Sequence, residues 1–271
     1  AEEYCLKCLK IIQLYNQGKA TRNTNANYLS LEKFEQAIFL GRETGFPDFE
    51  LKCLRQMGET YWQMGRLNLF LESNKKGLEI SNRINHKIEK GRCLNNIGVY
   101  HQKQNDYSLA LIYYENALSF IKAMDDQPTE AECLSNIGIL YRDLGNLTKA
   151  QQYLSSALEL DKKVGDIDSI LKDMDNIGSV YLRKGIDDQN TRDLLQALDV
   201  FRSCLALRGI EKTNSLIKFT ALNNIGIIHL FKGNYSEAID CYTKALKIKE
   251  EFGDKRGMSN CISNIGNVIF S

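Results

Sequence analysis

Asparagine recurs at a fixed place along this chain of 271 residues. Each of these asparagines comes two residues before a glycine that itself recurs, and they are Asn96, Asn136, Asn176, Asn224 and Asn264. Asparagine is a mediocre helix former, so helix propensity does not explain the repetition. A side-chain amide carries N–H donors and a carbonyl acceptor together, so a row of amides can pair with the backbone of an extended peptide. The same amides could instead bond to a neighbouring helix and fix how the repeats stack.

Basic side chains lie on or beside the same positions. They are Arg92, Lys103, Arg142, Lys172 and Arg183, and acidic residues such as Glu132 and Asp143 interrupt them. This pattern favours a partly acidic peptide, although a solvated mixed-charge surface has the same composition. Toward the C-terminus these positions become more apolar, with Ile139, Leu182, Ile227, Leu230 and Phe231. Such residues could seat hydrophobic side chains of a ligand, or they could pack between repeats.

The residue types needed for catalysis or metal binding are not arranged for either. The histidines are far apart in sequence, and His101 and His229 occupy a place held by tyrosine in other repeats, which predicts packing aromatics. Cys5 and Cys8 form a lone C-x-x-C without a second pair. The segment 186–193 is rich in Asp and Asn but lacks the spacing of a calcium loop, which predicts an exposed polar loop. We therefore expect no enzyme, no cofactor and no metal site.

Composition and cysteine placement narrow the class of protein further. A net charge of +1, from 35 basic and 34 acidic residues, gives no case for nucleic-acid binding. The sequence contains no apolar run of ~18 residues that would predict a membrane span. Cys53, Cys93, Cys133 and Cys261 each stand five residues before a recurring glycine, and Cys204 replaces an alanine of other repeats. Because these cysteines hold equivalent positions in separate repeats, we expect them to be small packing residues with reduced thiols. Reduced thiols favour a location in the cytoplasm. The alternative location is extracytoplasmic, as the sensor region of a membrane protein.

A repeated pair of helices is needed to position these residues. Glycine recurs at Gly58, Gly98, Gly138, Gly178, Gly226 and Gly266. The step is about 40 residues each time, except between Gly178 and Gly226, where it is longer, and a fixed period in this range is typical of a stacked repeat array. The first helix of each repeat contains this repeat glycine and is predicted to end about seven residues later, at Gly65, Asn105, Gly145, Gly185 and Gly233. Small residues such as Ala150 and Ala157 mark the second helix.

The repeats are predicted to form a single array over residues 1–271. Its boundaries are 2–45, 48–86, 87–126, 128–166, 168–211 and 214–254, followed by one first-type helix over 256–270. In the first repeat Gly18 is interpreted as the glycine between the two helices, with a long polar connection over 19–26. The last helix has no second helix after it and ends in Val268, Ile269 and Phe270. This predicts a fragment of a longer protein or an end that packs on something, with self-association through this helix as one outcome.

A rotation of 100° per residue assigns the faces of the first helices. Residues at positions −4, −1, 0 and +3 relative to the repeat glycine lie on one side of the helix, and we expect this side to face the core. Offsets −6, −2, +1 and +5 lie about 180° away. The asparagines, at offset −2, are therefore predicted to point away from the core.

The anchors Gly138, Tyr141, Gly145, Ala150 and Ala157 resemble the tetratricopeptide repeat, and the resemblance covers nearly the whole chain. The period of 40, in place of the usual 34, is similar to the longer-helix subclass. That subclass includes kinesin light chain, the Pins/LGN polarity scaffold, Rap-type regulators and sensor arrays of bacterial histidine kinases. The resemblance implies an all-α fold, a right-handed superhelix of antiparallel helix pairs whose first helices line the concave surface. Kinesin light chain and LGN use similar asparagines to hold peptide ligands.

We therefore expect a non-enzymatic interaction or scaffold module that binds an extended peptide or partner segment in a concave groove. Offset +1 is apolar in Val99, Ile139 and Ile227, which does not reproduce the carboxylate clamp of chaperone-binding relatives. The alternative function is the input region of a bacterial signal-transduction regulator or histidine kinase that responds to a ligand or partner. A Rap-like phosphatase would need an N-terminal helical bundle, whereas this chain begins directly with a repeat.

Overall fold

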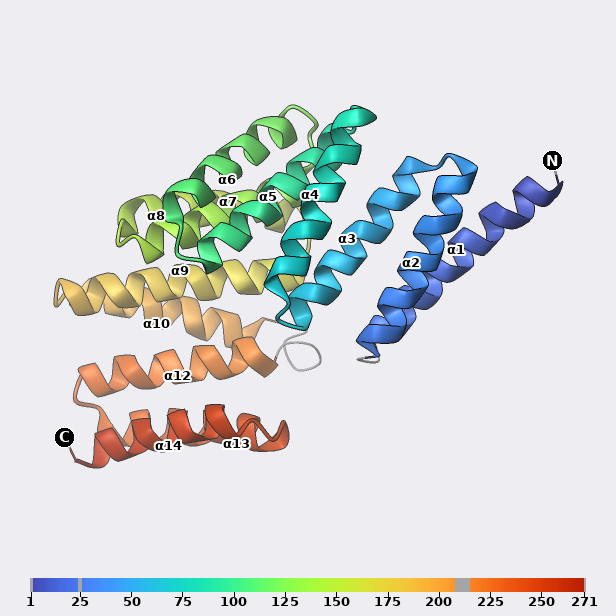
Figure 1. Ribbon diagram of the computed structural model, residues 1–271. Helices are drawn as coiled ribbons and strands as arrows, with labels where there is room; N and C mark the ends of the chain where they lie inside the picture. The colour runs from blue at the N-terminus through green and yellow to red at the C-terminus, as the bar shows by residue number, and fades with distance from the viewer. Residues whose placement is uncertain (1, 24–25, 208–214, 271) are drawn as a thin grey trace. The chain divides into compact units, whose positions relative to one another are not determined.

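Helices of similar length follow one another through the computed structural model, which describes residues 2–23, 26–207 and 215–270. No strand occurs within these ranges, and the fold is all-α (Figure 1). The chain divides into two compact units, residues 1–133 (unit 1) and 134–271 (unit 2), with the division inside helix α7. Successive helices pair with each other, so that odd-numbered helices up to α9 are first helices of a pair.

The helices of unit 1 are α1 (Glu2–Asn23), α2 (Asn27–Thr44), α3 (Pro47–Gln63), α4 (Leu67–Arg83), α5 (Lys87–Lys103), α6 (Tyr107–Lys122) and the first part of α7 (Gln127–Asp143). Unit 2 contains the rest of α7, α8 (Leu147–Val164), α9 (Ile167–Asp187), α10 (Thr191–Ala206), α12 (Ser215–Phe231), α13 (Tyr235–Glu251) and α14 (Lys255–Ile269). In unit 2 the first helices of the pairs are α7, α9, α12 and α14. The predicted boundary between the fifth and sixth repeats, at 211 and 214, lies outside the described residues.

Local capping explains where most helices start and stop. The side chains of Asp106, Asn146 and Asp254 accept hydrogen bonds from backbone N–H groups three residues later, at 3.3, 3.1 and 3.0 Å. First helices end at residues with a left-handed backbone, as predicted: Gly65, Asn105, Gly145 and Gly233 have φ of 69°, 61°, 80° and 73°. Gly185 does not have this role, so that one predicted helix end is wrong.

The insertion in the fifth repeat is exposed and polar, as predicted, but only residues 188–190 form a loop, and the rest of the segment extends α9 and α10. Helix α9 has 21 residues, against 17 in α7, and the left-handed residue after it is Gln189, with φ of 50°. Helix α10 begins six residues before Ala197, whereas α8 begins three residues before the equivalent Ala150. About one extra turn therefore extends each helix of the pair. Gly185 is buried inside α9, where a Cβ would lie 2.7 Å from Leu194.

Gly18 is also different from its predicted role. It lies inside α1, which continues to Asn23, and it does not separate two helices. Gly18 stands one repeat period before Gly58 and packs against Phe34 of α2, as repeat glycines do against their second helices. The first repeat therefore has ordinary helix spacing without a long connection. Residues 24–25 of the predicted connection lie outside the described part.

The core of each pair is built around the repeat glycine of the first helix. A Cβ at Gly98, Gly138 or Gly226 would lie 2.7, 2.6 or 2.5 Å from Tyr114, Leu154 or Tyr242 of the paired second helix. On α8 the small residues Ala150 and Ala157 stand before and after Leu154 in the sequence, and they let the backbones of α7 and α8 approach each other. Five cysteines are part of this packing, because Cys53, Cys93, Cys133, Cys204 and Cys261 are all buried. Their predicted packing role is confirmed.

Candidate peptide-binding face

The five repeated asparagines all lie half-buried on first helices. Asn96 belongs to α5 of unit 1, and the other four belong to α7, α9, α12 and α14 of unit 2. Three of them bond to a neighbouring helix. Asn96 Nδ2 donates to Asn74 Oδ1 at 2.9 Å, Asn176 Oδ1 accepts from Arg142 Nη1 at 3.0 Å, and Asn264 Nδ2 donates to Asn223 Oδ1 at 2.8 Å. Because an amide offers more than one donor and acceptor, a single such bond leaves capacity for a ligand.

In unit 1 the predicted basic residues are largely engaged. Arg92 donates to Glu89 and Asp126 at 2.8 and 2.9 Å, and its Nε donates to Thr129 at 3.1 Å. Lys103 Nζ lies 5.7 Å from the centre of the Trp62 ring. The charge of Arg92 is therefore balanced by two carboxylates, and its contacts join α5 to the start of α7. This arrangement suits a stacking role better than a ligand-binding role.

In unit 2 two arginines and an asparagine form a cluster across α7 and α9, which we call the arginine cluster: Arg142, Arg183 and Asn176. Arg142 bonds to Asn176, as above, and lies 3.1 Å from Asp143. Arg183 Nη1 donates to the backbone carbonyl of Arg142 at 3.0 Å, and its Nε lies 3.5 Å from Oδ2 of Asp187. Their side chains are 27% and 48% exposed. Lys172 is exposed one turn before Asn176 on α9, so positive charge flanks the half-buried amide.

A second row of polar residues, three positions before each repeat glycine, was not singled out from the sequence. Before Gly58, Gly98, Gly138, Gly178, Gly226 and Gly266 it contains Arg55, Asn95, Ser135, Asp175, Asn223 and Ser263. Asn95 Nδ2 donates to Glu132 Oε1 at 3.1 Å, and Thr220 Oγ1 donates to Asp175 Oδ1 at 3.1 Å, so these residues join one first helix to the next. The sequence does contain a signal for this row. These positions lie only about 60° around the helix from the repeat glycine, close to the core face, and yet all of those named are polar.

A pair of buried carboxylates also joins adjacent helices in unit 2. Asp161 of α8 and Asp173 of α9 are 5% and 2% exposed, and Ser135 of α7 donates to Asp173. Burial, with a smaller contribution from the neighbouring Asp161 carboxylate, raises the pKa of Asp173 to about 7. Oδ2 of Asp173 is buried without a hydrogen-bond partner. A proton on this pair would allow one carboxyl to donate to the other.

The predicted apolar positions mostly pack inside the fold. Leu182 is 7% exposed and belongs to the core between α9, α10 and α12, so of its two predicted roles the packing role is the one the structure supports. Ile139, Ile227 and Leu230 are half-buried against core clusters. Phe231, 48% exposed, is the member of this set that remains open to solvent. The face is therefore polar along α7 and α9.

The predicted packing role of His101 is confirmed. Its ring stacks on Tyr113 with 5.3 Å between ring centres and 5° between ring planes. His229 is half-buried and lies 3.4 Å from the side chain of Asn234. Neither ring is adjacent to another histidine, and the described residues contain no group of three or more His, Cys, Asp or Glu suited to a metal ion.

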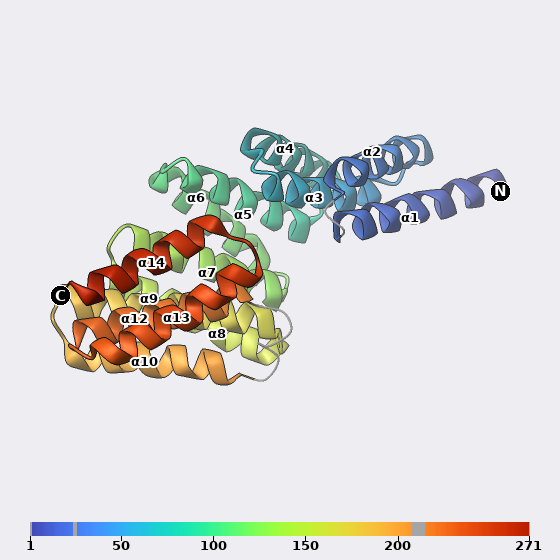
Figure 2. The same ribbon diagram turned by 90° about the horizontal axis from the view of Figure 1, so that it is seen from below.

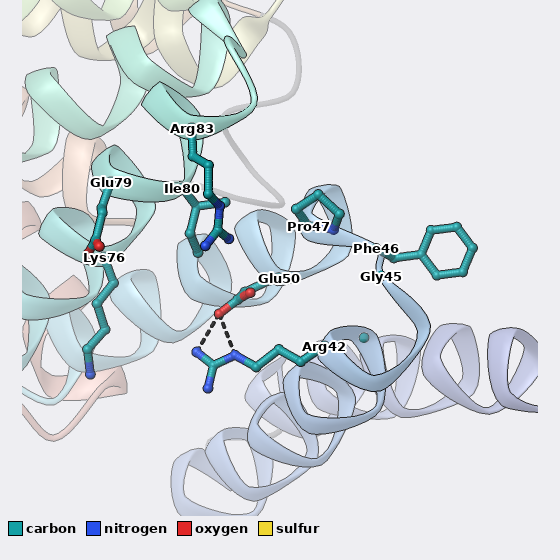
Figure 3. A pocket seen from close by; sticks show the side chains of 10 residues that line it. Arg42, Gly45, Phe46, Pro47, Glu50, Lys76, Glu79, Ile80 and Arg83 are labelled. Carbon is teal, nitrogen blue, oxygen red and sulfur yellow. Dashed lines mark hydrogen bonds and ion pairs between the residues drawn. The ribbon is translucent and has the colours of Figure 1, made fainter.

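A pocket of about 550 Å³ lies in unit 1 where the turn between α2 and α3 faces the end of α4 (Figure 3). Arg42 reaches across it, and its Nε donates to Glu50 Oε1 at 2.8 Å. Lys122 and Glu130, each two repeat periods further on, make the same pairing at 3.9 Å between α6 and α7. Because the pairing repeats, we interpret it as a stacking contact at the helix ends and place the candidate site elsewhere.

Comparison with family models decides the family. Models described as tetratricopeptide repeat match residues 49–123, 131–164 and 176–251, which is well over half of the chain. The chain belongs to the tetratricopeptide-repeat family. No curated protein sequence is significantly similar to it.

Solved structures support the same repeat fold at low sequence identity. A Rap protein complexed with competence and sporulation factor is 11% identical, with a TM-score of 0.63, over 96% of this chain and 75% of that one. Aspartyl phosphate phosphatase F from Bacillus subtilis is 14% identical, with a TM-score of 0.65, over 98% and 72%. The TPR-like repeats of a kinesin light chain from Podosopora anserina are 11% identical, with a TM-score of 0.58, over 75% and 96%. At these identities the likeness shows the fold alone.

None of the helices in the described ranges is both long enough and apolar enough to cross a bilayer.

Proposed function

We propose that this tetratricopeptide-repeat chain is a non-enzymatic interaction module that binds an extended, partly acidic peptide or partner segment on the first helices of unit 2. The family and its structural relatives support a protein–protein interaction module. The finer proposal rests on the arginine cluster, in which Arg142 and Arg183 hold positive charge beside the half-buried amide of Asn176.

Asn136, Asn176 and Asn224 would pair with the backbone of the peptide, because they occupy the same place on successive first helices. Asn264 would extend the row on α14. Arg142, Arg183 and Lys172 would select acidic side chains, since a guanidinium pairs well with a carboxylate. Asn96, Arg92 and Lys103 lie in unit 1, and a peptide contact for them is a separate proposal.

The proposal includes no cofactor and no nucleic-acid partner. A cytoplasmic location and a single array over the whole chain also stay predictions. The alternative function is a partner-responsive input region of a bacterial signalling regulator. The Rap protein relative was solved in complex with competence and sporulation factor, and under this alternative the present chain also responds to a bound partner.

Affinity capture from the source lysate tests the proposal. The bait proteins are the wild-type chain, the triple variant Asn136→Ala/Asn176→Ala/Asn224→Ala, and a matched control with alanines at Gln152 and Ser156, which are exposed on α8. Losing three hydrogen bonds of about 1 kcal/mol each should weaken a captured peptide by at least tenfold. Titration calorimetry measures this loss, and circular dichroism checks that the triple variant is folded. Equal affinity for all three proteins would contradict the proposal.

A charge variant tests the acidic character of the ligand. Arg183→Gln keeps a hydrogen-bonding side chain but removes one charge that is half exposed. For the captured peptide we expect weaker binding and a smaller loss of affinity between low and high salt, because screened charges contribute less. An unchanged salt dependence would show that the arginine cluster does not meet the ligand.

A further inference from the structure

Two hollows adjoin each other in unit 1, at the turns that join one pair of helices to the next. The first, which we call the charged hollow, is the pocket between the α2–α3 turn and the end of α4, with α3 lying between α2 and α4 (Figures 1 and 2). The second, which we call the apolar hollow, has a volume of about 480 Å³ and is lined by the start of α3, the α4–α5 turn and the α6–α7 turn. Pro47 lines both hollows, and Arg83 of the first is followed in the chain by Ile84 of the second.

Arg83 is the cation of the charged hollow that is open to a ligand. Arg42 is engaged by Glu50 in the repeated stacking contact, and Lys76 Nζ lies 2.7 Å from Oε1 of Glu72. Arg83 is exposed, and among the described residues its guanidinium has neither a hydrogen-bond partner nor an ion-pair partner. It extends from the end of α4 into the hollow (Figure 3). With three basic and two acidic side chains in its lining, the hollow favours an anionic group.

The apolar hollow depends on residues that are polar at the preceding turn. Ile84 and Ile88 are half-buried in its lining, and Met124 is 37% exposed. One repeat period earlier, the α2–α3 turn has Thr44 and Asp48 at these two isoleucine positions. The repeat fold therefore does not require apolar side chains here. Apolar surface rimmed by polar side chains is typical of a protein interaction site.

We propose that the two hollows together bind a short extended segment of a partner protein in which an acidic side chain stands within three residues of a large apolar one. The acidic side chain would pair with Arg83, since a guanidinium pairs well with a carboxylate. The apolar side chain would contact the isoleucines and the methionine of the apolar hollow. Arg83 and Ile84 are adjacent, and consecutive Cα atoms are about 3.8 Å apart, so side chains this close in an extended segment can reach both hollows.

A protein segment suits these hollows better than an enclosed small molecule does. Small-molecule sites are mostly apolar and surround most of the ligand. The charged hollow instead has four exposed charged side chains in its lining, which are Arg42, Lys76, Glu79 and Arg83. The inference does not depend on the function proposed above, because every residue of the two hollows belongs to unit 1 and the arginine cluster belongs to unit 2.

Methyl NMR of the full 271-residue chain, labelled at isoleucine and methionine, tests the proposal. The probes are synthetic peptides with one glutamate and one leucine, placed one, two or three residues apart in a sequence of glycine and serine. At least one of them should give saturable shifts of the methyl groups of Ile84, Ile88 and Met124, which line the apolar hollow. The same peptide should bind about threefold more weakly with glutamine for glutamate, and about tenfold more weakly with serine for leucine.

Two substitutions, one in each hollow, locate the binding. Arg83→Gln removes the open charge and should weaken the peptide about threefold, with no further loss when the peptide carries glutamine for glutamate. Ile88→Asp copies Asp48, the residue at the equivalent place of the preceding turn, and should weaken the peptide about tenfold. Lys75→Gln removes an exposed charge of α4 outside both hollows and should leave binding unchanged.

The absence of saturable shifts at every peptide spacing would overturn the proposal, as would equal affinity of the wild-type and Arg83→Gln proteins. Because Arg83 is exposed, this variant keeps the test valid even if Ile88→Asp fails to fold. Other occupants give different results. A second copy of the chain would shift the same methyl groups when the protein alone is concentrated, and a small amphiphilic anion would be indicated by octanoate binding as tightly as the peptide. Either result would replace the proposed partner segment.

Discussion

Two glycines at the same place in the repeat have opposite surroundings. Gly226 faces Tyr242 so closely that an added Cβ would lie 2.5 Å from the ring, whereas Gly266 faces open space. Gly226→Ala should therefore lower the free energy of unfolding by about 1–3 kcal/mol through overpacking. Gly266→Ala should raise it by about 0.5–1 kcal/mol, because alanine is the better helix former. Urea unfolding measures both, and destabilisation by both would contradict the packing described here.

The buried carboxylates make stability depend on pH in a defined direction. Burial raises the pKa of Asp173 from an unfolded value of about 3.9 to about 7. Between these values the folded state binds a proton that the unfolded state releases. Stability from this group is therefore complete below pH ~4 and is lost as the pH rises through about 7, by up to ~1.4 kcal/mol per pH unit.

Asp173→Asn removes this proton while keeping the shape of the side chain. The difference in unfolding free energy between wild type and this variant should change steadily between pH 4 and 7, with the wild type losing stability relative to the variant. Lys172 and Asp166 also lie near the pair and are unchanged in both proteins. A difference that is constant across this range would show that Asp173 is ionised throughout.

Single residues could be predicted where the same type recurs at one offset. The asparagines were found in this way, and their position away from the core follows from the helical period alone. Their partners could not be predicted, because Asn74, Arg142 and Asn223 come from other helices and stand at different places in the repeat. For Leu182 the sequence left ligand contact and packing open, and only the structure shows the core of α10 and α12 that it packs against.

At the scale of the element, the period predicted the pairing of helices but not their lengths. The end of α9 was expected at Gly185, since glycine often ends a helix. In the structure Gly185 is needed for close approach to Leu194, and Gln189 has the left-handed backbone instead. Sequence position alone does not distinguish a glycine that ends a helix from one that packs inside it. Gly18 was misinterpreted for the same reason.

A pair of substitutions checks where α9 ends. Gly185→Ala should destabilise the protein by about 1–3 kcal/mol, because its Cβ would lie 2.9 Å from the backbone nitrogen of Leu194. Gln189→Gly should stabilise it by up to about 1 kcal/mol, because glycine adopts positive φ without a steric penalty. Thermal unfolding followed by circular dichroism measures both changes. The reverse order of stabilities would place the helix end at Gly185.

For the whole molecule, fold class and family were predictable because the repeat is visible in sequence at nearly constant spacing. The cysteines were also predictable from the repeat, because those at equivalent positions are buried and reduced. Cys53, Cys93 and Cys204 have pKa values raised to about 12 by burial, so few thiolates form at neutral pH. Cys5 is exposed, and Cys8 and Cys241 are half-buried.

Thiol titration measures which of the cysteines are accessible in the folded chain. With Ellman's reagent the native protein should show Cys5 reacting first, with Cys8 and Cys241 slower. The five buried thiols should react only after unfolding in urea, when all eight are counted. Peptide mapping identifies the labelled residues. Fewer than eight reactive thiols in unfolded, unreduced protein would instead indicate disulfides.

The extra turns of α9 and α10 bear on how such a chain can change length during evolution. The insertion adds about one turn to each of two helices, which returns the connection between them to nearly the same side of both. An insertion of this size leaves every later side chain facing its original direction, so neighbouring pairs need no compensating change. One of five or nine residues would turn the following helix toward the wrong neighbour. Related chains should therefore gain or lose sequence at this hairpin in blocks of about seven.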